Sequence, residues 1–118
     1  AVATSMLQTP RLELQWLMVD TELPREQVKL VFLMLLCAET ALPVGGTITV
    51  SQRGDGYSIE IAGKRVHLCD AWRVFDEAAY NRILTPARVQ FPLAKYLAVE
   101  LGRKVSFDNS ETTLSVRF

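Results

Sequence analysis

The sequence lacks net charge, because 13 Lys and Arg residues balance 13 Asp and Glu residues among its 118 residues, and no run of Lys or Arg is longer than two. A protein that binds nucleic acid or a membrane surface through its overall field carries an excess of positive charge, so both partners are disfavoured. Internal repeats and low-complexity tracts are also missing. The 49% hydrophobic content predicts one domain over residues 1–118, with residues 1–10 as a loose lead-in.

Cysteine and histidine are scarce, since Cys37 and Cys69 are the two cysteines and His67 is the one histidine. Their spacing fits no zinc site. Both thiols lie among apolar residues, so we expect reduced thiols in a cytoplasmic protein rather than a disulfide. No signal peptide is evident. Because the sequence begins at Ala1 rather than Met, we expect a fragment or a processed product.

The most hydrophobic segment spans residues 28–42, where only Lys29, Glu39 and Thr40 are polar. A helix this apolar must be enclosed on nearly all sides. It is too short to span a bilayer, and its charges would be costly there. A Pro-Val-Gly-Gly turn at residues 43–46 closes it and leads into a β-branched strand.

Alternating polarity and turn residues predict the remaining elements. The predicted strands span residues 11–17, 47–51, 57–62, 65–68, 105–108 and 112–118. The predicted helices span residues 24–42, 71–80 and 87–101, after a connection at residues 20–24. We expect Asp70 to cap the second helix, and Thr85 with Pro86 to begin the third. Pro92 marks a kink near Phe91 or the true start of the third helix.

Gly102 is expected to end that last helix, and a turn at residues 109–110 to join the final two strands. The order β-α-β-β-(β)-α-α-β-β predicts an α/β (α+β) two-layer sandwich. Antiparallel pairs interleaved with two principal helices predict a mixed sheet with the helices on one face.

Residues 28–50 and 89–118 together resemble the ATP-binding domain of sensor histidine kinases, the GHKL or Bergerat fold. Three features are most similar to the C-terminal domain of ChpT-type histidine phosphotransferases, which serve the alphaproteobacterial cell-cycle phosphorelay. They are the Leu-rich helix that runs into Ala-Leu-Pro-x-Gly-Gly-Thr, the preceding strand with Trp16, and the Val-Gln pair at residues 89–90. The resemblance covers nearly the whole chain from Arg11.

The nucleotide-binding chemistry is missing where the resemblance places it. A working kinase helix uses an Asn to hold Mg²⁺, and that position falls near Cys37, with Leu33 one turn earlier. A thiol among leucines is a poor ligand for Mg²⁺. The adenine-reading Asp-x-Gly-x-Gly motif is replaced by Ile-Ala-Gly-Lys at residues 61–64, and no glycine lies between Gly63 and Gly102, where the lid motif belongs. We expect no ATP, metal or other cofactor, and assign no catalytic, cofactor-binding or metal-binding residue.

His67 and two neighbouring cations have a functional and a structural interpretation. The resemblance implies that the phosphoacceptor His lies on a separate N-terminal helical hairpin, for which the ten residues before Arg11 are too few. We therefore expect His67 to be a structural or surface residue on a strand. Lys64 and Arg65 are candidates for phosphate contacts in a vestigial pocket, but we favour solvated charges at a strand end.

The remaining candidates have simpler structural interpretations. Asp70, Asp76 and Glu77 suggest a metal cluster, yet helix capping and an exposed helix face explain them better. Cys69 has no base at a useful spacing, which disfavours a nucleophile. Trp16 and Trp72 are expected to be core or core-edge aromatics.

The resemblance implies a non-catalytic interaction domain of a histidine phosphotransferase. The acceptor His would then belong to a dimeric four-helix bundle absent from this chain, and this domain would help to dock response-regulator receiver domains. The alternatives are a divergent ATP-binding domain of a sensor kinase or anti-sigma factor, with a mobile lid between Gly63 and Pro86, and a stand-alone scaffold. We expect a monomer without nucleic-acid or membrane partners.

Overall fold

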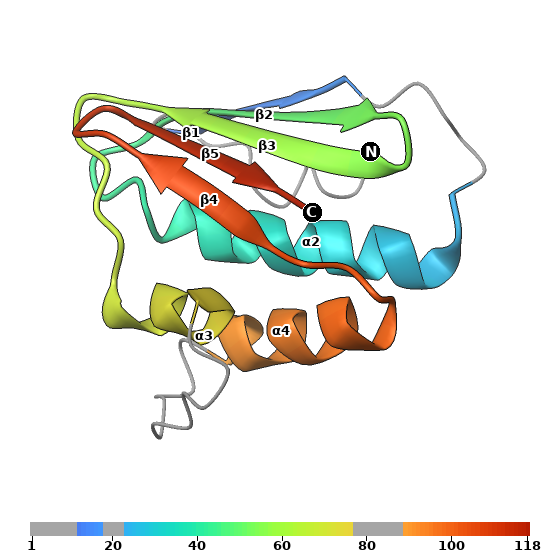
Figure 1. The fold of residues 1–118 in the computed structure, drawn as a ribbon. Helices are drawn as coiled ribbons and strands as arrows, with labels where there is room; N and C mark the ends of the chain where they lie inside the picture. Colours follow the sequence, from blue (N-terminus) through green and yellow to red (C-terminus); the bar gives the residue numbers. More distant parts are fainter. Residues whose placement is uncertain (1–11, 18–22, 77–88) are drawn as a thin grey trace.

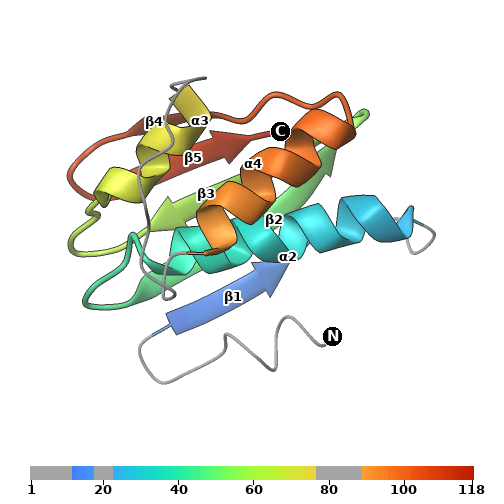
Figure 2. The ribbon, with the colours of Figure 1, turned by 90° about the horizontal axis from the view of Figure 1, so that it is seen from below.

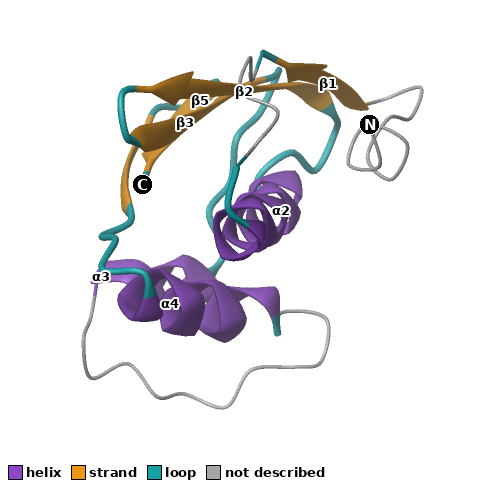
Figure 3. Cartoon of the chain, turned by 90° about the vertical axis from the view of Figure 1, so that its right-hand side faces the viewer, coloured by secondary structure: helices purple, strands orange, loops and turns teal. Residues whose placement is uncertain are grey.

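The computed structural model describes residues 12–17, 23–76 and 89–118, and it shows a sheet with helices on one of its faces (Figure 1, Figure 3). The strands are β1 (Leu12–Trp16), β2 (Gly46–Arg53), β3 (Gly56–Ala62), β4 (Ser106–Asn109) and β5 (Thr113–Arg117). The helices are α2 (Arg25–Glu39), a 3₁₀ turn (Asp70–Trp72), α3 (Arg73–Asp76) and α4 (Gln90–Glu100). The predicted lead-in at residues 1–10 and the start of the last helix at Thr85 and Pro86 lie outside the described residues.

The described strands form one mixed sheet in the order β1-β2-β3-β5-β4. The strands β1 and β2 are parallel and are joined through α2, and the remaining neighbours are antiparallel. Figure 2 shows α2 and α4 side by side under this sheet. The prediction of a two-layer α+β fold with a mixed sheet and helices on one face is confirmed.

Helix α2 supplies much of the core. Its buried side chains are Leu30, Val31, Met34, Leu35, Cys37 and Ala38. The helix ends at Glu39, three residues before the predicted end. The amides of Thr40, Ala41 and Leu42 each donate to a carbonyl three residues back, at 3.2, 3.0 and 3.2 Å, so the chain tightens into 3₁₀ geometry.

The start of α4 decides between the two predictions for Pro92. The helix begins at Gln90, which puts Pro92 in its first turn. A first-turn amide has no acceptor within the helix, so the missing N–H of proline costs nothing there and no kink is needed.

Gly102 ends α4 as predicted. It has φ +67°, its amide donates to the Val99 carbonyl at 3.0 Å, and the Arg103 amide donates to the Ala98 carbonyl at 2.8 Å. These two bonds are the Schellman pattern.

Two local predictions are wrong. Residues 65–68 form no strand, because the Val66 amide donates to the Glu111 carbonyl and the His67 amide to the Ala41 carbonyl, which belong to different segments. The N-cap of the 3₁₀ turn is Cys69 rather than Asp70, which is the first residue inside the turn. The helix that follows is described only to Asp76.

Tyr57 on β3 ties the sheet to both long helices. Its hydroxyl donates to Gln27 Oε1 on α2 at 2.5 Å, and the guanidinium of Arg103, which follows α4, lies 5.0 Å from its ring centroid. Arg103 also donates to the Phe118 carbonyl at 2.9 Å. The layers are therefore joined by polar contacts as well as by the apolar core.

No helix formed by the described residues is long and apolar enough to cross a bilayer.

Candidate functional site

The Cys37 side chain is fully buried on α2, inside the apolar core. Burial raises the pKa of the Cys37 thiol well above its usual value, and the neighbouring Cys69 raises it further. The thiol is therefore protonated at neutral pH, whereas a metal ligand must be a thiolate. Leu33, one turn earlier, is partly buried against the same core. Neither residue offers the hard oxygen donor that Mg²⁺ requires.

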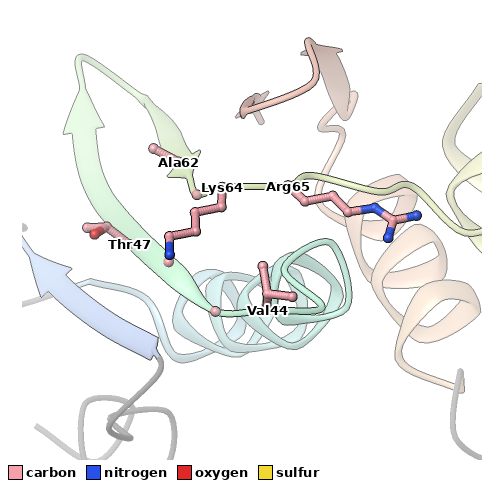
Figure 4. Close-up of a pocket in the computed structure, with 8 residues that line it drawn as sticks. Val44, Thr47, Ala62, Lys64 and Arg65 are labelled. Carbon is pink, nitrogen blue, oxygen red and sulfur yellow. The ribbon is translucent and has the colours of Figure 1, made fainter.

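A groove opens where α2 gives way to β2 and where β3 ends (Figure 4). It has a volume of about 830 Å³ and is lined by Val44, Gly45, Gly46, Thr47, Ala62, Gly63, Lys64 and Arg65. The backbones meet closely at its base: a Cβ on Gly63 would lie 2.7 Å from the Gly45 carbonyl oxygen and 2.9 Å from Leu42 Cδ2. Glycine is required there for packing between backbones.

Lys64 and Arg65 are both exposed at this groove. Their side chains diverge, since Lys64 extends toward β2 near Thr47 whereas Arg65 extends away from it (Figure 4). Two cations that grip one phosphate must converge on it, so this arrangement does not form a two-pronged phosphate clamp.

The predicted aromatic roles are confirmed. Trp72 is 2% exposed and meets Phe75, Phe91 and Phe107 edge-on, with ring centroids 5.7, 5.4 and 5.2 Å away. Trp16 is partly buried at the edge of the core, 6.3 Å from the Phe32 ring. Both residues contribute to packing.

The other polar candidates are spread apart. His67 is exposed, in an extended segment rather than a strand. The thiols of Cys37 and Cys69 are both free. Glu77 and the side chain of Asp76 lie outside the described residues. Among the residues that are described, no three His, Cys, Asp or Glu side chains gather in a way that could hold a metal ion.

One surface feature escaped the sequence analysis. Large apolar side chains lie on the outer side of α4, at Val89, Leu93, Tyr96 and Val99. The sequence contains an indication of this feature, because the buried positions of α4 include the small residues Ala94 and Ala98. Periodicity alone does not tell which of two apolar faces is covered.

Comparisons with known proteins agree with this geometry. The family model described as "Histidine phosphotransferase C-terminal domain" matches residues 1–113. A structure of a bacterial phosphotransferase superposes with a TM-score of 0.88 at 26% identity, over 98% of this chain. The match covers 59% of that phosphotransferase, so the present chain spans less than two thirds of its length. No curated protein sequence matches the chain.

Sensor kinases share the fold at lower identity. The blue-light activated histidine kinase EL346 of Erythrobacter litoralis has a TM-score of 0.59 at 12% identity, with 99% of this chain and 38% of the kinase covered. The mycobacterial sensor histidine kinase MprB has a TM-score of 0.60 at 14% identity, with coverages of 99% and 89%. The predicted histidine kinase ATPase-like (Bergerat) fold is thereby confirmed.

Proposed function

The chain belongs to the family of histidine phosphotransferase C-terminal domains, and from this premise we propose that it is a non-catalytic docking domain, which supports the binding of response-regulator receiver domains and does not bind ATP. The phosphoacceptor His would lie on a helical hairpin elsewhere in the full protein, as it does in ChpT-type phosphotransferases. Residues 1–118 would act as one domain, in the cytoplasm.

The burial of Cys37 is the observation that best supports the proposal that this domain does not bind ATP. In a nucleotide-binding relative, the equivalent helix position presents an Asn to the Mg²⁺ that bridges the phosphates. Here the side chain is fully buried and carries a thiol that stays protonated. A soft, neutral and inaccessible group cannot replace an amide oxygen in the coordination of Mg²⁺.

The other two nucleotide contacts are also absent from the sequence. β3 ends at Ala62 and is followed by Gly63 and Lys64, where an adenine-reading Asp would stand. Losing one charge-assisted hydrogen bond costs about 1.5–3 kcal/mol. When the loss of metal bridging and of the phosphate-binding loop is added, the total loss of binding free energy for ATP reaches about 4 kcal/mol or more, which is about a thousandfold in affinity.

Isothermal titration of the full-length protein with ATP and Mg²⁺ tests this part of the proposal. The expected result is no measurable heat of binding with the protein at tens of micromolar, beside a nucleotide-binding histidine kinase as positive control. A dissociation constant in the micromolar range would overturn it and would support a divergent ATP-binding domain. Loss of that binding in Lys64→Ala would place the nucleotide in the groove at the end of β3.

Phosphotransfer to receiver domains tests the parent function. The full-length protein, phosphorylated on His, is expected to transfer its phosphoryl group to receiver domains from the same organism. A protein that never acquires phosphate from a phosphorylated receiver or hybrid kinase would instead be a stand-alone scaffold with this fold.

A further inference from the structure

Helix α4 and the residue that precedes it carry most of the large hydrophobic side chains that are strongly exposed among the described residues. Six large hydrophobic side chains are strongly exposed in those residues, and four of them belong to α4 or to the residue that precedes it. The four are Val89 (51% exposed), Leu93 (48%), Tyr96 (68%) and Val99 (62%), which together with Pro92 we call the α4 face. A concentration of this kind on one short helix is not the scattered exposure that ordinary surfaces show.

The side chains of α4 are distributed in the opposite way to what the burial of apolar surface alone would favour. Its buried residues are Phe91, Ala94 and Ala98, and the two alanines allow α4 to pack close to α2. The larger Leu93 and Tyr96 remain in solvent. Burying large side chains and exposing small ones would stabilise the fold more, so another requirement holds these residues at the surface.

The α4 face is continuous. At 100° per residue, positions 89, 93 and 96 lie within one narrow stripe, and positions 92 and 99 extend it on one side. All five residues are exposed, and Glu100 is the one charged residue within the same arc. Lys95 flanks the stripe and makes no ion pair within the described part of the chain.

The size of this face indicates the kind of complex it forms. Its exposed apolar area is roughly 400 Å², which is in the range of functional patches on monomers. A stable, specific complex buries about 800 Å² on each partner, so the α4 face alone does not hold a permanent dimer. A face of this size fits a transient complex, in which the partner binds and then dissociates.

We propose that the α4 face is where this domain contacts a receiver domain, through an apolar patch on the receiver with acidic residues opposite Lys95. This inference rests on the proposed docking function, and it names the surface through which the docking would occur. The helix α4 lies on the far side of α2 from β1 (Figure 1, Figure 2), so the receiver would dock away from the β1 end of the sheet.

Titration of the full-length protein with purified receiver domains from the same organism tests the inference. We expect Leu93→Ser and Tyr96→Ser each to raise the dissociation constant for the receiver at least tenfold. The matched control is Leu17→Ser, which removes a leucine that follows β1 and is more exposed (58%) than Leu93 (48%). This control is expected to change the dissociation constant less than twofold. Thermal unfolding of each variant within a few degrees of wild type excludes loss of the fold.

The possible outcomes distinguish failure of the surface assignment from failure of the proposed docking function. If the wild-type protein binds none of the receivers, both are overturned. If it binds them and the two α4 variants bind equally well, only the assignment of the surface is overturned. An assembly of the full-length protein larger than the dimer expected from its four-helix bundle, seen in sedimentation and lost in Tyr96→Ser, would instead make the occupant a second copy of this chain.

Discussion

Gly46 packs so closely against Ala62 that a Cβ on residue 46 would come within 2.3 Å of the Ala62 carbonyl oxygen. Its φ of +148° adds backbone strain for any other residue. We expect Gly46→Ala to lower the free energy of unfolding by about 3 kcal/mol or more, measured by urea denaturation. Gly54→Ala is the matched control, because Gly54 has φ +57° but open space around it, and about 1 kcal/mol is expected. Equal losses would show that strain rather than the clash dominates.

Because the Cys37 thiol is buried, we expect the free energy of unfolding to depend on pH in the alkaline range. Its pKa is raised in the folded state, chiefly by burial, so the unfolded chain releases this proton first as the pH rises above the ordinary thiol value of 9.0. The free energy of unfolding is therefore expected to fall with rising pH in this window, by up to about 1.4 kcal/mol per pH unit.

Urea denaturation between pH 7 and pH 10 measures this fall by comparison with Cys37→Ala, which lacks the titrating thiol but shares the other groups. Cys69→Ala is expected to retain the fall, because burial is the larger cause of the shift. A wild-type protein whose pH profile parallels that of Cys37→Ala would contradict the assignment.

Trp72 is needed for its volume and not for its polar atom. Its Nε1 is buried without a hydrogen-bond partner in the described part of the chain, and its ring is enclosed by three phenylalanines. We expect Trp72→Phe to cost less than about 1.5 kcal/mol of unfolding free energy. Trp72→Ala is expected to cost about 3–5 kcal/mol, because it leaves a cavity. Equal losses for the two variants in chemical denaturation would indicate a hidden hydrogen bond.

Pro92 is expected to be replaceable because α4 begins only two residues before it. Pro92→Ala should change the free energy of unfolding by less than about 0.5 kcal/mol. Lys95→Pro, three residues deeper in the same helix, is expected to cost about 3 kcal/mol. Helical circular dichroism during denaturation compares the two. A large loss in Pro92→Ala would mean that the ring itself contributes to packing.

The parts of the fold that sequence predicts well are those in which local and tertiary requirements agree. The alternation of side chains predicted β3, and Gly102 predicted the end of α4. Both predictions succeed because the pleat of a strand and the left-handed φ of a glycine are local properties. Residues 65–68 also look like a strand, but their amides bond to Glu111 and Ala41. Those acceptors are brought near by the rest of the fold, which no local pattern encodes.

The candidate site divides in the same way. The burial of Cys37 follows from its apolar neighbours on α2, and so it was predictable. The divergence of Lys64 and Arg65 depends on where β3 releases the chain, and the exposure of Tyr96 depends on what α2 leaves uncovered. These two features required the assembled structure.

The end position of β4 has a consequence for how the domain opens. β3 is bonded to a strand on each side, whereas β4 is bonded to β5 alone among the described strands. We expect the amide protons of β4 to exchange with solvent during excursions that leave the inner strands closed. In each excursion Phe107 would leave the neighbourhood of Trp72, and the edge of that buried ring would be wetted. Local opening at β4 would thus expose the aromatic core before the rest of the sheet unfolds.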